Sequence, residues 1–169
     1  NVLVTGLVLG ADGRKMSKNY GNYPDPKELL QKYGGDALRL YLLSSRVVNG
    51  EDIKISEEEY RNQARRFLLI LNNIYNFFAT YANVDDWKPN GDFAKGDIAV
   101  PRALEGEENL SALDRWVLAR LSELHLVVTR ALEQYDTISA IQGLENFLGD
   151  LSQWYIRRSR DRVGPSASD

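Results

Sequence analysis

Two lysines that follow an apolar run have the type and spacing to act on a charged ligand. The segment "GRKMSKNYGN", residues 13–22, places Lys15 and Lys18 on either side of Met16 and Ser17, with glycines around them. A lysine ammonium is a compact charge on a flexible stem and suits a phosphate, and glycine lets the backbone approach a ligand. On composition alone, a merely solvated basic loop remains the alternative, because charge runs usually are that.

A second group of cations lies at the end of the last helical pattern. Its members are Arg157, Arg158, Arg160 and Arg162. Arginines there can pair with phosphates, and Trp154 or Tyr155 could stack on a base. The alternatives are structural: a cationic helix end is favoured by the helix dipole. Both aromatic residues fall on the apolar stripe, so we expect them in the core.

Composition excludes several classes of function. The 169 residues carry a net charge of -3, so a polyanion would have to meet a local patch. Without cysteine there is no thiolate zinc site, and His125 alone cannot build a histidine site. The loop aspartates lack the spacing of a calcium loop, so we assign no metal. These are Asp85, Asp86, Asp92 and Asp97. No apolar stretch reaches membrane-spanning length, and the start lacks both Met and a basic leader, so we expect a piece of a larger protein.

The elements that must position these groups begin with a short strand-loop-helix region. Residues 1–10 read as one strand or two short ones, ending at the Asp12-Gly13 turn. Asp25 is the expected N-cap of a helix with Pro26 in its first turn and Glu28 completing a capping box, and Gly34 ends that helix. Asp36 is expected to cap a second helix over "ALRLYLLSS".

Three long amphipathic helices follow, and their apolar stripes must pack together. The first starts at a Ser56/Glu59 capping box and ends near Ala82. Its expected inner face is Tyr60, Ala64, Phe67, Leu71, Ile74, Phe78 and Tyr81. The second starts at a Ser111/Asp114 box. Its expected inner face is Leu113, Val117, Leu121, Leu124, Val128, Ala131 and Tyr135. The third begins near Ile138, and residues 83–109 read as an irregular connection. The fold class is therefore mainly α, a helical bundle.

Order and context make the lysine segment more specific. "KMSKN" resembles the KMSKS signature of class I aminoacyl-tRNA synthetases, and the text on both sides matches as well: "GLVLGADGRKMSK", then "NYPDPKELLQKYGGDALRLYLLSS". "VVNGEDIKISEEEYR", "LDRWVLARL" and "QWYIRRSR" are similar to the isoleucine branch of that family. The resemblance spans nearly the whole chain. Asn19 replaces the final serine of the signature, and the family's His-Ile-Gly-His signature is absent.

The resemblance implies roles for individual residues. Lys18 corresponds to the catalytic lysine that stabilises the triphosphate of ATP as the adenylate forms, because a positioned cation there meets growing negative charge. Lys15, Met16 and Ser17 would complete the ATP-binding loop. Arg157, Arg158 and Arg160 are the expected tRNA-binding residues. Trp154 is expected to hold the core.

The resemblance also implies an organisation and a function. Residues 1–22 would be the end of a catalytic domain, residues 23–55 a stem-contact helical segment, and residues 56–169 an anticodon-binding helical bundle. The parent would be an ATP-dependent isoleucine–tRNA ligase with magnesium, a cytoplasmic monomer with isoleucine, ATP and tRNA(Ile) as partners. The segment alone is expected to be inactive, with no bound cofactor and no contact with a membrane. The alternatives are the matching segment of a valyl- or leucyl-tRNA synthetase, a tRNA-binding module without catalysis, and a purely structural bundle.

Overall fold

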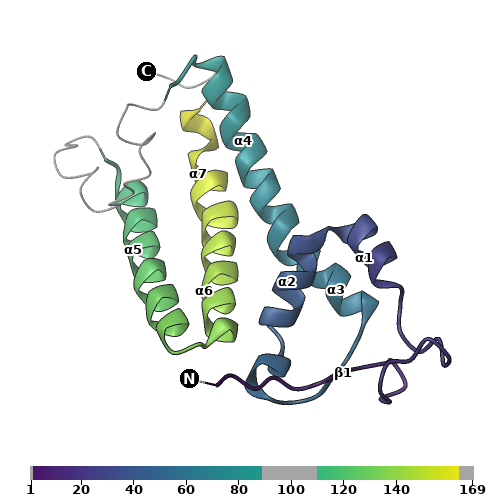
Figure 1. The fold of residues 1–169 in the computed structure, drawn as a ribbon. Coiled ribbons are helices and arrows are strands. Elements are labelled where there is room, and N and C mark those ends of the chain that lie inside the picture. The colour runs from purple at the N-terminus through teal and green to yellow at the C-terminus, as the bar shows by residue number, and fades with distance from the viewer. Residues whose placement is uncertain (1, 89–109, 164–169) are drawn as a thin grey trace. The chain divides into compact units, whose positions relative to one another are not determined.

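The structure is a computed structural model that describes residues 2–88 and 110–163 (Figure 1). Helices dominate the described residues, which confirms the predicted mainly α fold class. The chain divides into two compact units. Unit 1 comprises Asn1–Leu69 and Val127–Glu145, and unit 2 comprises Ile70–Leu126 and Asn146–Asp169. The lysine segment belongs to unit 1 and the arginines belong to unit 2.

The N-terminal strand of unit 1 is much shorter than predicted. Strand β1 covers only Val8–Leu9 and pairs in parallel with β2, Ile53–Lys54. Val2, Leu3 and Val4 are well exposed, since no described strand continues the ladder beside them. A β-carbon on Gly6 would lie 2.0 Å from the carbonyl oxygen of Glu51, so a glycine permits this close approach. No strand is predicted from the sequence where β2 lies.

Two short helices, α1 (Pro26–Tyr33) and α2 (Gly35–Leu43), follow the lysine segment. The side chain of Asp25 caps α1 by accepting a hydrogen bond from the backbone of Lys27 at 2.8 Å, as predicted, although Glu28 is not the donor. Gly34, with a φ of 84°, ends α1. The prediction that Asp36 caps α2 is wrong. Gly34 is the N-cap, and Asp36 lies in the first turn, where it forms an ion pair with Arg39.

The chain continues from α2 through the 3₁₀ turn η1 (Arg46–Asn49) and β2 to α3 (Glu57–Gln63). Helices α1 and α2 pack on α3 around a small aromatic core. The buried members of the core are Leu29, Ala37, Tyr41 and Tyr60. The hydroxyl of Tyr60 donates to the carbonyl of Gly34 at 2.8 Å, so this buried phenol is satisfied. Ser56 caps α3 as predicted, because its hydroxyl accepts from the backbone of Glu59. The capping box is present only in part, since the described bond of the Glu59 side chain is the one from the Tyr41 hydroxyl.

The first long helix contains a π-helical turn that the sequence did not indicate. After α3, η2 (Ala64–Leu69) is π-helical and α4 (Ile70–Val84) returns to α-helical geometry. A π turn adds residues to one turn and shifts the face that the following residues present. Leu71 and Phe78, both predicted inside, are exposed, so the prediction is wrong at these two positions. Ile74 and Tyr81, also predicted inside, are partly buried, as is Phe77, which was not predicted.

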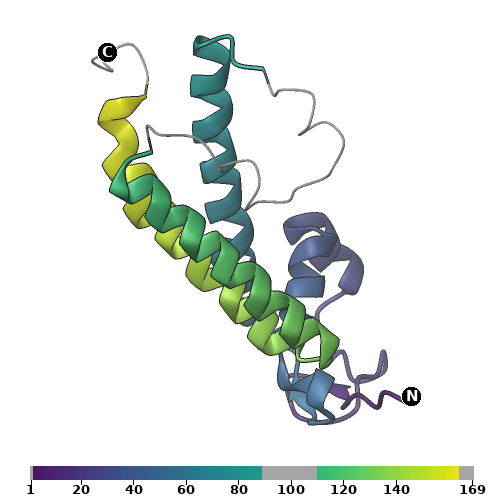
Figure 2. The same cartoon turned by 90° about the vertical axis from the view of Figure 1, so that its left-hand side faces the viewer.

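The second and third long helices follow in sequence. In unit 1, the end of α5 (Ala112–Glu133) turns into α6 (Thr137–Gly149), and the two lie side by side there (Figures 1 and 2). Tyr135 makes the turn with a φ of 61° and is exposed, so its predicted place on the inner face is wrong. The remaining predicted inner-face positions of α5 are buried or half-buried. The predicted irregular connection covers residues 83–109. Of these, residues 89–109, with Asp92 and Asp97 among them, lie outside the described residues.

The C-terminal part of the third helix is irregular. α6 continues through the π-helical η5 (Asp150–Ile156), α7 (Arg157–Ser159) and the 3₁₀ turn η6 (Arg160–Arg162). In unit 2, η5 packs against α4. None of the helices described is both long and apolar enough to cross a membrane.

Candidate nucleotide and nucleic-acid sites

The lysine loop, residues 13–22, is braced by the side chain of Asn22. Its Oδ1 accepts from the backbone of Ser17 at 3.0 Å, and its Nδ2 donates to the carboxylate of Asp12 at 2.9 Å and to the carbonyl of Lys15 at 3.3 Å. One amide side chain therefore ties both ends of the loop to its middle. A β-carbon on Gly10 would lie 2.4 Å from the Asn22 amide, so glycine is needed beside the brace.

Asp12 forms the other half of the brace. It accepts from the backbone of Arg14 at 3.0 Å and forms an ion pair with the guanidinium of that residue at 2.8 Å. The hydrogen bond from the Arg14 backbone, followed by the one from Asn22, lowers the pKa of the Asp12 carboxyl to about 2. The guanidinium of Arg14 also lies 4.8 Å from the ring centre of Tyr20, on the far side of the loop. Asp12 is thus ionised and fully engaged at neutral pH.

The bracing leaves the loop lysines exposed. Lys15 contributes its backbone, through an isolated bridge to Leu9, while its side chain is exposed. Lys18 is exposed and makes no ion pair with a described residue. It lines a surface hollow of about 610 Å³, together with Gly21, Tyr23, Asp25, Pro26 and Lys27. Two lysines, Lys18 and Lys27, therefore line one hollow of ligand size, together with the acidic Asp25.

Sequence reasoning singled out the lysines and missed the residues that hold them. Asp12 was read only as part of a turn with Gly13, and Asn22 and Lys27 were not considered. A usable signal exists in hindsight, since Asp and Asn side chains commonly hydrogen-bond to the nearby backbone in loops. Asn19, which replaces the serine of the signature, takes part in the loop only through its backbone. Its N–H donates to the hydroxyl of Ser17 at 3.3 Å, and its side chain makes no bond with a described residue.

The arginines at the chain's last helical turns differ sharply in their surroundings. Arg157, Arg158 and Arg160 are exposed and form no ion pair with a described residue; we call these three the arginine surface. Trp154 is half exposed, so its predicted place in the core is wrong. The buried and half-buried stripe of this helix passes through Leu148, Tyr155 and Ser159 instead. The guanidinium of Arg158 lies over the ring of Trp154, 4.2 Å from its centre.

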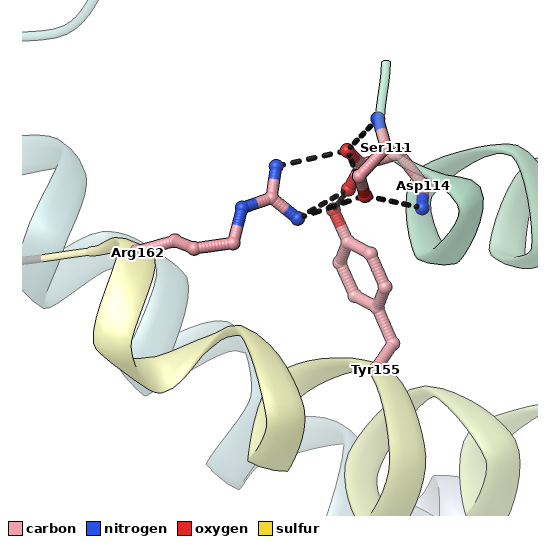
Figure 3. Close-up of polar contacts among 4 residues, drawn as sticks. All are labelled: Ser111, Asp114, Tyr155 and Arg162. Atoms are coloured by element: carbon pink, nitrogen blue, oxygen red, sulfur yellow. Dashed lines mark hydrogen bonds and ion pairs between the residues drawn. The ribbon is translucent and has the colours of Figure 1, made fainter. Parts of the chain in front are cut away.

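Arg162 is engaged in an interaction that we call the Asp114 network (Figure 3). Its Nη1 and Nη2 each donate to a different oxygen of the Asp114 carboxylate at 2.8 Å. The hydroxyl of Tyr155 donates to the same carboxylate at 2.9 Å, and that of Ser111 does so at 2.7 Å. Asp114 returns a backbone hydrogen bond to Ser111, which confirms the predicted capping box. The C-terminal turns are thereby fixed to the start of α5.

The Asp114 network explains how a carboxylate can be buried in unit 2. Asp114 is 5% exposed, and a buried charge requires hydrogen-bonding partners. The bonds from Arg162, followed by those from Ser111 and Tyr155, hold the pKa of Asp114 well below its usual range. Burial raises the pKa of the Tyr155 hydroxyl, which therefore remains a donor at neutral pH. Arg162 is consequently a structural cation, in contrast to the arginine surface.

Beside this network, unit 2 contains an apolar cavity of about 500 Å³ between α4 and the C-terminal turns. Its lining includes Phe77, Tyr81, Trp87, Tyr155 and Ser159. Among the described residues, no group of three or more acidic, histidine or cysteine side chains is placed to hold a metal ion.

Comparison with known proteins matches both parts of the chain to one family. Residues 1–56 match the model described as tRNA synthetases class I (I, L, M and V), and residues 114–168 match the anticodon-binding domain of tRNA ligase. An isoleucine–tRNA ligase of Treponema denticola is 42% identical over the whole chain. One from Protochlamydia amoebophila is 40% identical over 96% of it, and one from Bdellovibrio bacteriovorus is 42% identical over 95%.

The chain spans about 15% of the length of these relatives: 15%, 14% and 14%, respectively. A crystal structure of a ternary complex of the Agrobacterium radiobacter K84 agnB2 LeuRS with tRNA and LeuAMS has the same fold, with a TM-score of 0.63. That match covers 96% of this chain and 18% of the LeuRS chain, at 21% identity. These findings confirm the family expected from "KMSKN" and its flanking sequence. The chain belongs to the class I tRNA synthetases, and within that family it resembles a segment of the isoleucine–tRNA ligases.

Proposed function

We propose that this chain is the part of an isoleucine–tRNA ligase that supplies the ATP-stabilising loop and a tRNA-docking helical surface. The proposal rests on one observation: two sets of exposed cations lie on parts of the chain whose backbone is fixed by hydrogen bonds. Lys15 and Lys18 stand on a braced loop, and the arginine surface stands on a helix fixed by the Asp114 network. None of these side chains forms an ion pair with a described residue. Free cations on ordered backbones are what phosphate recognition requires.

For the loop, the proposed chemistry is stabilisation of the triphosphate during activation of isoleucine. Lys18 meets the phosphates as negative charge grows on the leaving pyrophosphate, and Lys15, Met16 and Ser17 shape the loop around the nucleotide. The hollow beside Lys18 supports this assignment because a second lysine, Lys27, also lines it. Magnesium would arrive with ATP in the longer enzyme. The isolated chain is proposed to be inactive, because the relatives are several times longer.

For the helices, the proposed partner is tRNA(Ile), bound through its phosphates by Arg157, Arg158 and Arg160. The family match of residues 114–168 to an anticodon-binding domain supports this role, since the arginine surface lies within those residues. The match of residues 1–56 also supports the proposed organisation, in which residues 1–22 end a catalytic domain, 23–55 contact the tRNA stem and 56–169 form the bundle. We propose a cytoplasmic monomer as the working form of the parent.

A salt titration of tRNA binding tests the docking role. We expect the chain to bind tRNA(Ile) weakly, with an affinity that falls as salt rises, because phosphate contacts release counterions. Arg157→Gln and Arg160→Gln together should weaken binding and flatten the log–log salt slope by roughly one for each lost contact. Lys88→Gln is the control for each arginine substitution made singly. It also removes one positive charge from unit 2, but at a lysine that lies 3.9 Å from Asp86. Equal slopes for all variants would refute the arginine surface as the docking site.

A further inference from the structure

Trp154 differs from an ordinary half-exposed apolar residue. A single exposed tryptophan requires no explanation by itself. Here, however, the ring lies under the guanidinium of Arg158 at 4.2 Å, and half of the residue remains open to solvent. Arg157 and Arg160 follow three and six residues further along the same short stretch of helix, exposed and without ion-pair partners among the described residues. An exposed aromatic ring under one guanidinium, with further exposed arginines in the next two turns, has the composition of a nucleic-acid stacking site.

The helix holds Trp154 outward by fixing its neighbours inward. The hydroxyl of Tyr155, the next residue, is bonded to Asp114 at 2.9 Å, and Arg162 is bonded to the same carboxylate. Ser159 is buried on this side of the helix. Since these three positions fix the rotation of the C-terminal turns, the ring of Trp154 stays at the surface. Trp154 also lies in the π-helical η5, and such turns occur frequently at functional sites.

Trp87, in the same unit, provides an internal comparison. It is 51% exposed and Trp154 is 50% exposed, so the two rings offer similar surfaces to solvent. Trp87, however, packs edge-on against Phe78 at 5.5 Å, and its sequence neighbours are Asp85, Asp86 and Lys88, with Lys88 3.9 Å from Asp86. The charge beside Trp87 is therefore net negative, which disfavours a polyanion. Exposure is therefore shared by both residues, and the cationic surroundings are specific to Trp154.

We propose that Trp154 and Arg158 form a platform on which an unpaired base of the bound tRNA stacks, while Arg157 and Arg160 contact the adjoining phosphates. The ring supplies a π surface, and the planar guanidinium extends it with a positive charge. Unpaired bases are the natural targets because bases within an RNA helix are already stacked on their neighbours. This proposal rests on the tRNA-docking function above and adds to it a specific aromatic residue and a preference for unpaired RNA.

Fluorescence of Trp154 tests the stacking directly. In a Trp87→Phe, Trp116→Phe background, Trp154 is the only tryptophan, since the chain has three, and excitation selective for tryptophan isolates its emission from that of the tyrosines. The probes are an RNA hairpin with the sequence of the tRNA(Ile) anticodon arm and a blunt duplex of the same stem without unpaired bases. At matched occupancy, we expect the hairpin to quench the emission of Trp154 and the duplex to leave it unchanged.

Affinity measurements separate stacking from charge. Trp154→Leu should weaken hairpin binding about 5- to 150-fold, the range for loss of one base–aromatic stack, while leaving the salt slope unchanged. Trp154→Phe should restore most of the affinity, and Arg158→Lys should weaken binding although the charge is kept. The matched control, Trp87→Leu, should bind like the wild type. Melting temperatures establish that the variants compared are folded.

The outcomes distinguish this proposal from the function on which it rests. Unchanged emission and unchanged affinity of Trp154→Leu, with a salt slope that still depends on Arg157 and Arg160, would overturn the platform alone. Equal quenching by hairpin and duplex would overturn the preference for unpaired bases. No binding of either RNA or of tRNA by the wild-type chain would overturn the docking function and the platform together.

Discussion

The lysine loop of unit 1 and the arginine surface of unit 2 both present cations without described ion-pair partners, but they are held by different means. The loop depends chiefly on the half-buried Asn22 and the exposed Asp12, and the bond between these two side chains is exposed to water. The arginine surface stands on a helix whose inner side is fixed by a buried, multiply bonded carboxylate, that of Asp114. Exposed polar contacts contribute little net stability, whereas charge-assisted bonds to a buried group contribute more. The loop is thus built to yield locally, and the helix to keep its shape.

The largest effect should come from removing the lysine that the loop presents. In the full-length parent, Lys18→Ala should slow isoleucine-dependent ATP–pyrophosphate exchange by about 10²–10³, because one transition-state charge contact is lost. Isoleucine binding should be nearly unchanged, and Lys15→Ala should have the smaller effect. An exchange rate equal to that of the wild type would refute the role of Lys18 in stabilising the triphosphate. The lysine loop would then not be a phosphate site comparable to the arginine surface.

Next in size should be the loss of the buried carboxylate. Asp114→Ala removes a helix cap and the charged acceptor of Arg162, so we expect a loss of about 2–4 kcal/mol in the free energy of unfolding. Urea titration followed by circular dichroism measures it. Asp161→Ala, at an exposed carboxylate next to Arg162 in η6, is the control and should change stability by about 0.5 kcal/mol or less. Equal losses in both variants would contradict the special position of Asp114.

Acid should remove the contribution of Asp114 in a defined direction. Its pKa in the folded protein lies below the ordinary value, so folding favours the ionised form. The stabilisation is therefore complete above the ordinary carboxyl pKa and is lost as pH falls toward the folded value. We expect the stability difference between the wild type and Asp114→Asn to be constant near neutral pH and to shrink between about pH 5 and about pH 2. A difference that grows on acidification would contradict this.

The smallest effect should be the local loosening of the lysine loop. Asn22→Ala removes three hydrogen bonds, yet global stability should hardly change, because the loop can open without unfolding unit 1. If the net loss is about 1 kcal/mol, the Ser17 amide should exchange its hydrogen about fivefold faster. Asn19→Ala is the matched control, since the described bond of Asn19 is made by its backbone. Unchanged exchange in Asn22→Ala would show that the brace is unimportant.

Features set by neighbouring residues were predictable from the sequence. The caps at Asp25, Ser56 and Ser111 follow from side chains that bond within the next three residues, and the structure contains all of them. The predicted inner face of α5 was also correct at every position within that helix. The family was identified from short motifs, because "KMSKN" and "QWYIRRSR" are distinctive as written.

Features that depend on distant contacts were missed or wrong. A simple helical period gives no signal for the two π-helical segments, η2 and η5, and it also placed Leu71 and Phe78 inside although both are exposed. Trp154 was assigned to the core for a related reason, since the stripe that includes Tyr155 passes beside it. Strand β2 exists only through its pairing with β1. The bonds of Asn22 require a folded loop, and no periodicity reports them.

The parallel pairing of β1 with β2 has a consequence for the order in which unit 1 assembles. The two strands are joined through a long stretch of chain, and the bond from Leu7 to Asp52 spans 45 residues. Closing such a stretch early costs considerable chain entropy for only a few hydrogen bonds. The core of α1, α2 and α3 lies within or next to that stretch and rests on nearer contacts, so it should form first and bring the strand partners together. The lysine loop directly follows β1. It would therefore be among the last parts of unit 1 to become ordered during folding and among the first to lose its structure during unfolding.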